Sequence, residues 1–227
     1  VMSAAPRWPY PSLWPAEWQM SQWRHLLAGS DALATSLGIG LAASLTALAL
    51  AVVWFESQPP QRDRVLLGLA LLALALPQLV TASGLYLLFL RLNLTGTLPG
   101  LFLAHLMPVL AYTVIVLAGP YRAFDPRFAA VARALRVGPF RLWWKVKGPL
   151  LRGPLLMAAA VGFGVSMVQF VPAQLVAAGR YATLPMEAVT LASGGNRALT
   201  AAYALALALP PMIAFVLSGY FGRPRWR

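Results

Sequence analysis

The chain has 227 residues, of which 59% are hydrophobic and only 11% are charged, and its formal net charge is +12. Soluble globular domains carry about 25% charged and about 45–50% apolar residues, so this composition argues against an ordinary soluble enzyme. A basic surplus can indicate nucleic acid, but so apolar a chain points first to a lipid bilayer. The chain has no cysteine, which excludes disulfides and cysteine-based metal or catalytic sites.

Five long runs of the sequence contain no charged residue. They comprise 24, 26, 30, 27 and 25 residues, and each exceeds the ~20 apolar residues with which a helix crosses a bilayer. Backbone that crosses lipid must satisfy its own hydrogen bonds, so each run predicts a transmembrane helix. The predicted helices are Ala32–Phe55, Val65–Leu90, Leu98–Gly119, Pro154–Ala178 and Leu199–Phe221. The predicted fold class is therefore an all-α polytopic membrane protein with five visible transmembrane helices.

Prolines and small residues add detail to these helices. Four of the five contain proline, at Pro77, Pro108, Pro172 and the Pro210-Pro211 pair. Membrane bundles tolerate such prolines, so the kinks fit either helices that line a path or ordinary bending. Ala34, Gly38 and Ala42 form a stripe of small residues, which predicts close helix packing on that face of the first helix.

The basic residues predict the orientation. Alternate loops of a five-span protein share a side, and one side holds 13 Lys and Arg residues against 5 on the other. Basic residues favour the cytoplasmic side. We therefore expect the loop 122–152 and the basic tail 223–227 in the cytoplasm, and the N-terminus outside.

The segment 1–31 is rich in Pro and Trp and is predicted to be extracytoplasmic and interfacial. Within it, Pro15 to Leu27 fits either a short amphipathic surface helix or a plain linker. It shows no signal-peptide pattern, so we expect an upstream transmembrane helix to place it outside, and the sequence to be a fragment. Residues 32–222 then form the transmembrane domain.

The loop from Pro120 to Gly153 holds 8 of the 18 basic residues and a single acid, Asp125. Its apolar residues recur at helical spacing and predict a helix from about Asp125 to Val137, ended by Gly138-Pro139. Asp125 is the expected N-cap. A second short run follows from Phe140 to Lys147. The loop fits either an interfacial helix on anionic lipid or a docking helix for a cytoplasmic partner.

The stretch from Ala130 to Val137, followed by Phe140, Trp143, Val146 and Pro149, resembles the "EAA loop" of permease subunits in binding-protein-dependent ABC importers. That motif reads roughly E-A-A-x-x-x-G, then nine residues, then I/V-x-L-P. Ala130 stands where the motif has Glu, and Arg136 where it has Gly. The resemblance covers about residues 20–222. It is nearest to the permeases for thiamine, iron and polyamines, and most of all to thiamine-type permeases in which two such halves are fused.

The resemblance implies a type I importer core in the bacterial inner membrane, with a cytoplasmic coupling helix. It implies cytoplasmic ATP-binding subunits, a second permease unit and an extracytoplasmic solute-binding protein as partners. The residues that it assigns to the ATPase-coupling loop are Ala130, Val131, Ala132, Arg133, Leu135, Arg136, Val137, Gly138, Phe140, Trp143, Val146 and Pro149. Because Arg136 is bulkier than Gly, we expect the loop helix to continue about half a turn further.

The few polar groups at membrane depth are candidates for the translocation path, since such groups usually face the interior of a bundle. They are Gln78, Thr81, His105, Tyr112, Thr113, Ser166 and Gln169. The alternative for each is an interhelical hydrogen bond.

Other function classes fit the sequence less well. A secondary transporter usually carries an embedded acid or base, which the five charge-free runs lack. An enzyme needs a catalytic constellation, and the two histidines and six acids are scattered. No catalytic, cofactor or metal site is predicted, and the chain has no P-loop. Nucleic acid is excluded as a partner because the basic residues are split among membrane loops. A structural or assembly role stays open, and the substrate is not specified.

Overall fold

The computed structural model describes residues 2–4, 18–28 and 31–223, and every regular element in those ranges is helical. In chain order the elements are the 3₁₀ turn η1 (Met2–Ala4), α1 (Ser21–Ala28), α2 (Asp31–Ser57), the 3₁₀ turn η2 (Pro60–Arg62), α3 (Asp63–Ala75), α4 (Gln78–Arg91), α5 (Leu98–Arg122), α6 (Arg127–Ala134), α7 (Pro139–Leu142), the π-helical turn η3 (Trp143–Lys147), α8 (Gly148–Leu150), α9 (Arg152–Met167), α10 (Val171–Ala177), α11 (Leu184–Ser193) and α12 (Arg197–Phe221). The predicted all-α architecture is confirmed.

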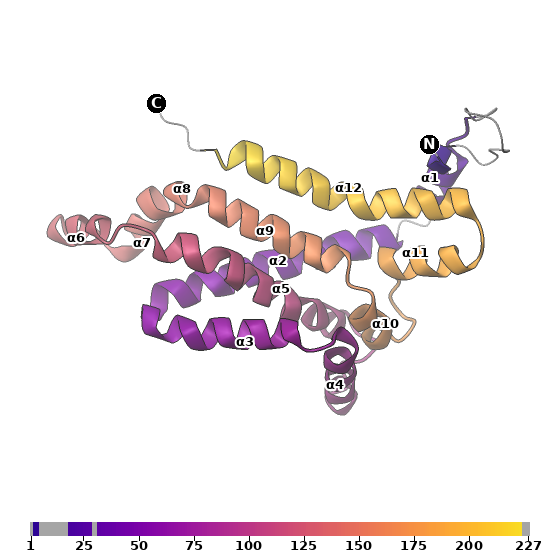
Figure 1. Ribbon diagram of the computed structural model, residues 1–227, viewed down its shortest axis with the longest axis horizontal. Coiled ribbons are helices and arrows are strands. Elements are labelled where there is room, and N and C mark those ends of the chain that lie inside the picture. The colour runs from indigo at the N-terminus through magenta and orange to yellow at the C-terminus, as the bar shows by residue number, and fades with distance from the viewer. Residues whose placement is uncertain (1, 5–17, 29–30, 224–227) are drawn as a thin grey trace.

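Within the described ranges, three unbroken helices, α2, α5 and α12, are long and apolar enough to cross a membrane. Two bent pairs are further candidates. The first joins η2 and α3 to α4 with a bend of 102°, and the second joins α7, η3 and α8 to α9 with a bend of 77°. α2 and α5 pack side by side, α9 packs on both, and α12 lies along α9, so that the helices form an elongated bundle (Figure 1).

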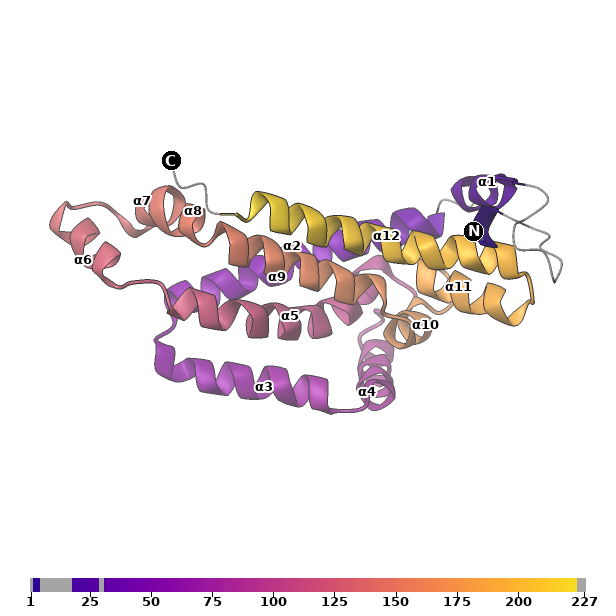
Figure 2. The ribbon, with the colours of Figure 1, turned by 45° about the horizontal axis from the view of Figure 1, so that its top comes forward.

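The second predicted helix, Val65–Leu90, is not continuous. The chain leaves α3 at Leu76, whose backbone is extended, with φ −71° and ψ 139°. Pro77 explains the break, because its ring disfavours the helical conformation of the preceding residue. α4 begins directly after Pro77 and runs across the direction of α3 (Figure 2).

The prediction of one continuous helix over Pro154–Ala178 is also wrong. α9 ends at Met167, and α10 begins at Val171. Pro172 lies in the first turn of α10, where its missing N–H removes no intrahelical hydrogen bond. By contrast, α5 continues through Pro108, and α12 continues through its proline pair.

The core forms where α2, α5 and α9 pack together. Glycines allow the close approach: a Cβ on Gly40 would lie 3.0 Å from the Phe163 ring, and a Cβ on Gly162 would lie 3.0 Å from Thr113 Oγ1. The Ser44 hydroxyl donates to a backbone carbonyl of α9 at 3.1 Å. Small residues and single hydrogen bonds are the usual means by which membrane helices associate.

The predicted packing stripe of Ala34, Gly38 and Ala42 does not face the helices that pack on α2 within the described residues. These residues are exposed, and a Cβ on Gly38 would meet nothing within 4 Å. The face that packs carries Gly40 instead. Because α2 is apolar all round, its sequence does not distinguish the buried face from the face left for lipid.

The loop helices and the N-terminal helix lie toward opposite ends of the bundle. Both views place α6, α7 and α8 with the end of α12 at one end, and α1 and α11 toward the other (Figures 1 and 2). α1 covers part of the helix predicted over Pro15–Leu27, and it packs on α12. Trp8, Trp14 and the tail 224–227 lie outside the described residues.

Candidate functional site

The loop between α5 and α9 begins with a hydrogen bond between Asp125 and the first residue of α6. The Asp125 carboxylate accepts a hydrogen bond from the Arg127 backbone N–H at 2.8 Å. This bond satisfies the free N–H of the first residue of α6, but the residue in the N-cap position is Pro126 rather than the expected Asp125. The helix α6 runs from Arg127 to Ala134, so it is shorter than predicted from the apolar spacing.

α6 ends in a Schellman motif. Arg136 has a positive φ of 54°. The Val137 N–H donates to the Ala132 carbonyl at 2.8 Å, and the Arg136 N–H donates to the Arg133 carbonyl at 3.0 Å. The expectation that the helix continues past Arg136 is therefore wrong. The resembled motif has glycine at the position where the backbone turns left-handed, and this chain makes the same turn with arginine.

An apolar groove of about 570 Å³ lies between α6 and the second half of the loop. The predicted coupling residues that line it are Val131, Ala132, Leu135, Val137 and Val146. The side chains of Val131 and Leu135 are 58% and 70% exposed. Three basic residues, Arg127, Arg141 and Lys145, and one acid, Asp125, also line the groove. The groove thus combines uncovered apolar surface with positive charge.

The other predicted coupling residues are spread along the loop. Ala130 and Arg133 are exposed on α6, Gly138 precedes α7, Phe140 lies in α7, Trp143 in η3 and Pro149 in α8. Phe140 is 76% exposed and contacts Trp144 edge to face, with 6.1 Å between ring centroids. Phe140 and Trp144 therefore form an uncovered aromatic pair that is not part of the groove lining.

A polar anchor that sequence reasoning did not identify fixes the start of the loop. The Arg122 guanidinium donates to both carboxylate oxygens of Asp63, at 2.5 and 2.9 Å. It also donates to the backbone carbonyls of Phe55 and Gln58, each at 3.0 Å. The Trp54 indole N–H donates to Asp63 at 3.2 Å. The anchor joins the end of α2, the start of α3 and the end of α5. The sequence offers one hint of it, because Asp63 and Arg122 are charged residues near the ends of charge-free runs.

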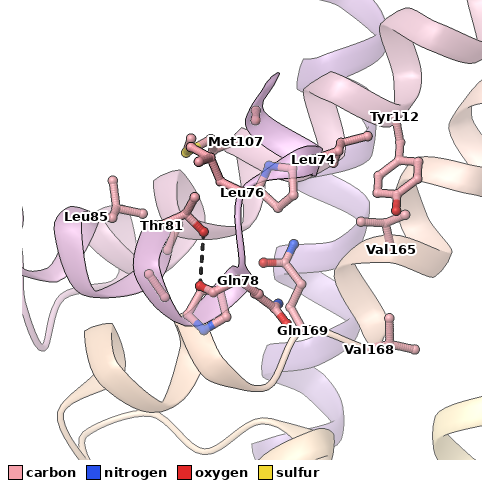
Figure 3. A pocket seen from close by; sticks show the side chains of 15 residues that line it. Leu74, Leu76, Gln78, Thr81, Leu85, Met107, Tyr112, Val165, Val168 and Gln169 are labelled. Atoms are coloured by element: carbon pink, nitrogen blue, oxygen red, sulfur yellow. Dashed lines mark hydrogen bonds between the residues drawn. The ribbon is translucent and has the colours of Figure 1, made fainter. Parts of the chain in front are cut away.

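A cavity of about 340 Å³ lies where the α3–α4 elbow meets α5, α9 and α10. The predicted path residues that line it are Gln78, Thr81, Tyr112 and Gln169 (Figure 3). The Thr81 hydroxyl donates to the Gln78 carbonyl at 3.0 Å. The remaining wall is apolar, and none of the described residues that line the cavity carries a charge.

The other three predicted path residues lie between helices. His105 Nδ1 is 2.8 Å from Ser166 Oγ, and Thr113 is fully buried. Gln169 belongs to both groups, because it lines the cavity while its Nε2 donates to the His105 carbonyl at 3.1 Å. His105 and Ser166 therefore fit the alternative of an interhelical hydrogen bond. Thr113 does not, because its buried hydroxyl has no hydrogen-bond partner among the described residues. A path role for all seven residues stays a prediction.

The chain is similar to several known transport proteins, although no protein-family profile matches it. It is 38% identical over 189 residues to the inner membrane ABC transporter permease protein YnjC of Escherichia coli, which covers 83% of this chain and 36% of YnjC. It is 24% identical over 185 residues to the spermidine/putrescine transport system permease protein PotC of the same species, covering 82% of this chain and 68% of PotC. It is 29% identical over 195 residues to the molybdenum transport system permease protein ModB of Mycobacterium tuberculosis, covering 77% of this chain and 72% of ModB.

These relatives are permeases of transport systems and not enzymes, so the chain is a homologue of ABC transporter permeases and the predicted resemblance is confirmed. Homology and the apolar helices together indicate a multi-pass inner-membrane protein. The chain spans only 36% of the length of YnjC. The relatives' names do not single out the thiamine-type subgroup, which stays a prediction.

Proposed function

We propose that this homologue of ABC transporter permeases is a membrane-spanning subunit of an ATP-driven ABC importer. It pairs with a second permease unit, binds cytoplasmic ATPase subunits and receives solute from an extracytoplasmic solute-binding protein. The loop between α5 and α9 and the C-terminus face the cytoplasm, and the N-terminus lies outside. Homology supports the subunit type, and the distribution of basic residues, 13 against 5, supports the orientation.

The observation that carries this proposal is the uncovered apolar face of α6. Val131 and Leu135 are 58% and 70% exposed in a loop that lies beyond the long apolar helices. Burying such side chains fully contributes about 1.5–3 kcal/mol each, so the face is a strong site for a partner. We assign it to the ATPase, whose complementary groove would be apolar with an acidic rim opposite Arg127, Arg141 and Lys145.

The mechanism follows from this attachment. Closure of the ATPase subunits on ATP displaces α6, and the packed helices rock between two discrete arrangements. The uncharged cavity at the α3–α4 elbow forms part of the path for the solute. Its lining supports ATP-driven import over ion-coupled transport, which usually places an acid or base at membrane depth.

The test is retention of the ATPase subunit by the permease extracted in mild detergent. Val131→Asp or Leu135→Asp places a charge in the docking face, and we expect the retained ATPase to fall about tenfold or more, because a buried unpaired charge is strongly unfavourable. Gln61→Asp adds the same charge at an exposed position in η2 and should leave retention unchanged. A wild-type permease that never retains an ATPase, or Asp variants that retain it fully, would refute the proposal.

A further inference from the structure

Lys147, at the end of η3, lies in a cage of one carboxylate and two aromatic rings. Its Nζ is 2.7 Å from a carboxylate oxygen of Glu56. The same atom lies 4.2 Å from the centroid of the Tyr121 ring and 5.4 Å from that of Phe124. The Lys147 side chain is only 16% exposed. Ion-pair and cation–π contacts are stronger when they are partly removed from water. Lys147 is therefore held more firmly than an exposed lysine, although the Glu56 side chain is 40% exposed.

The start of η3 attaches to the same place. The Trp143 indole N–H donates to the Tyr121 hydroxyl at 3.0 Å, and that hydroxyl donates to Glu56. Tyr121 in turn stacks on Phe55 of α2, with 5.3 Å between ring centroids. Both ends of the π turn are therefore fastened to one junction between the ends of α2 and α5.

The π turn is itself held by a close backbone contact. The Gly148 N–H donates to the Trp143 carbonyl, which is the long hydrogen bond of a π turn. A Cβ on Gly148 would lie 3.1 Å from that carbonyl oxygen. π turns are rare and are found frequently at functional sites. Here the turn brings Trp143 and Lys147 to the same tyrosine.

We propose that Lys147 is a positioning residue for energy coupling, which makes η3 move as one body with the ends of α2 and α5. The inference rests on the proposed function, because the motion it transmits is that of an ATPase-bound α6. α6 supplies the docking face, and the Lys147 cage is the joint through which displacement of the loop reaches the membrane helices. Without the cage the loop would still bind the ATPase, but η3 would move independently of α2 and α5 and the displacement would not reach the membrane helices.

The experiment uses the complete transporter, with permease units, ATPase and solute-binding protein, reconstituted in liposomes. The readouts are ATPase retention, basal ATP hydrolysis, and hydrolysis stimulated by the solute-binding protein as purified. For Lys147→Gln we expect normal retention and basal hydrolysis but about a tenfold loss of stimulation, as for the loss of a partly desolvated charge contact. Lys147→Arg keeps the cation and should retain most of the stimulation. Arg64→Gln removes an exposed positive charge at the start of α3 and should behave as wild type.

A double-mutant cycle tests whether the lysine acts through its partner. Glu56→Gln should reduce stimulation as Lys147→Gln does, and the double variant should be no worse than the single variants. Stimulation of Lys147→Gln within twofold of wild type would overturn the inference. Loss of ATPase retention in Lys147→Gln would also overturn it, since the cage would then serve docking. A wild-type permease that binds no ATPase refutes the proposed function instead, so the two failures are distinguishable.

Discussion

Arg136 ends α6 in a backbone conformation that is energetically unfavourable for arginine. Its φ is 54°, and the left-handed region costs an L-residue about 1–2 kcal/mol, whereas glycine adopts it freely. The two hydrogen bonds of the Schellman motif offset this cost. The resemblance to the EAA loop correctly places the end of the loop helix at Arg136. The size of the arginine side chain does not lengthen α6. The left-handed backbone conformation of Arg136 determines where α6 ends.

Arg136→Gly should therefore strengthen the end of α6. We expect about 1 kcal/mol of local stabilisation, seen as roughly fivefold slower amide hydrogen exchange in residues 127–137. Arg133→Gly is the matched control, because it places glycine inside α6 and should speed exchange by a similar factor. Slower exchange in neither variant, or in both, would contradict the strain assigned to Arg136.

At the scale of the elements, close packing of α5 on α9 depends on Gly162. A Cβ there would lie 3.0 Å from Thr113 Oγ1 and 3.1 Å from Val109. Overpacking of this kind costs about 1–3 kcal/mol. Gly162→Leu should lower the thermal unfolding midpoint of the detergent-solubilised protein by several degrees, roughly the shift that such a cost produces in a chain of this size.

Gly38→Leu is the control for that substitution, since α2 leaves open space at Gly38. It makes the same change of residue inside a long helix and should leave the midpoint unchanged or slightly raised, because leucine favours helix over glycine. Equal destabilisation by both substitutions would show that Gly162 is not a packing contact.

The sequence predicts where helices lie better than how they bend or face one another. Charge-free runs locate α2, α5 and α12 because lipid imposes one simple requirement on a spanning helix. Pro77 marked a kink, but the 102° turn depends on what α4 packs against, which is α10, far along the chain. The packing face of α2 was missed because apolar residues surround the whole helix.

The same distinction holds for the candidate site. The face of α6 follows from local spacing, so Val131 and Leu135 could be identified from the sequence alone. The partners of Lys147 could not, because Glu56 and Tyr121 come from distant segments and only the fold brings them together. Lys147 looked like one more basic residue in a basic loop.

At the scale of the whole molecule, the docking face and the cavity are far apart. α6 lies at one extremity of the bundle, whereas the cavity opens near α4 and α10 (Figure 1). Coupling between them needs a packed element with two arrangements that both sites influence. α5 runs from the cavity wall at Tyr112 to the loop anchor at Arg122, and it packs on α2, α3 and α9. α5 is therefore the element best placed to transmit a conformational change from the docking face to the cavity.

If α5 carries the change, the cavity should alter its accessibility with the nucleotide state of the ATPase. The chain has no native cysteine, so a single introduced cysteine is the only thiol of this subunit, and the unsubstituted transporter gives the background from the other subunits. Tyr112 is 40% exposed at the cavity, and Tyr112→Cys in the reconstituted transporter should react with a small water-soluble thiol reagent at rates that differ between ATP-trapped and nucleotide-free states. Thr113 is the next residue and fully buried between helices. Thr113→Cys should react at least roughly tenfold more slowly in both states, the factor that corresponds to about 1.4 kcal/mol of local opening. Equal reactivity of the two cysteines, or no dependence on nucleotide at Tyr112→Cys, would remove the cavity from the transport path.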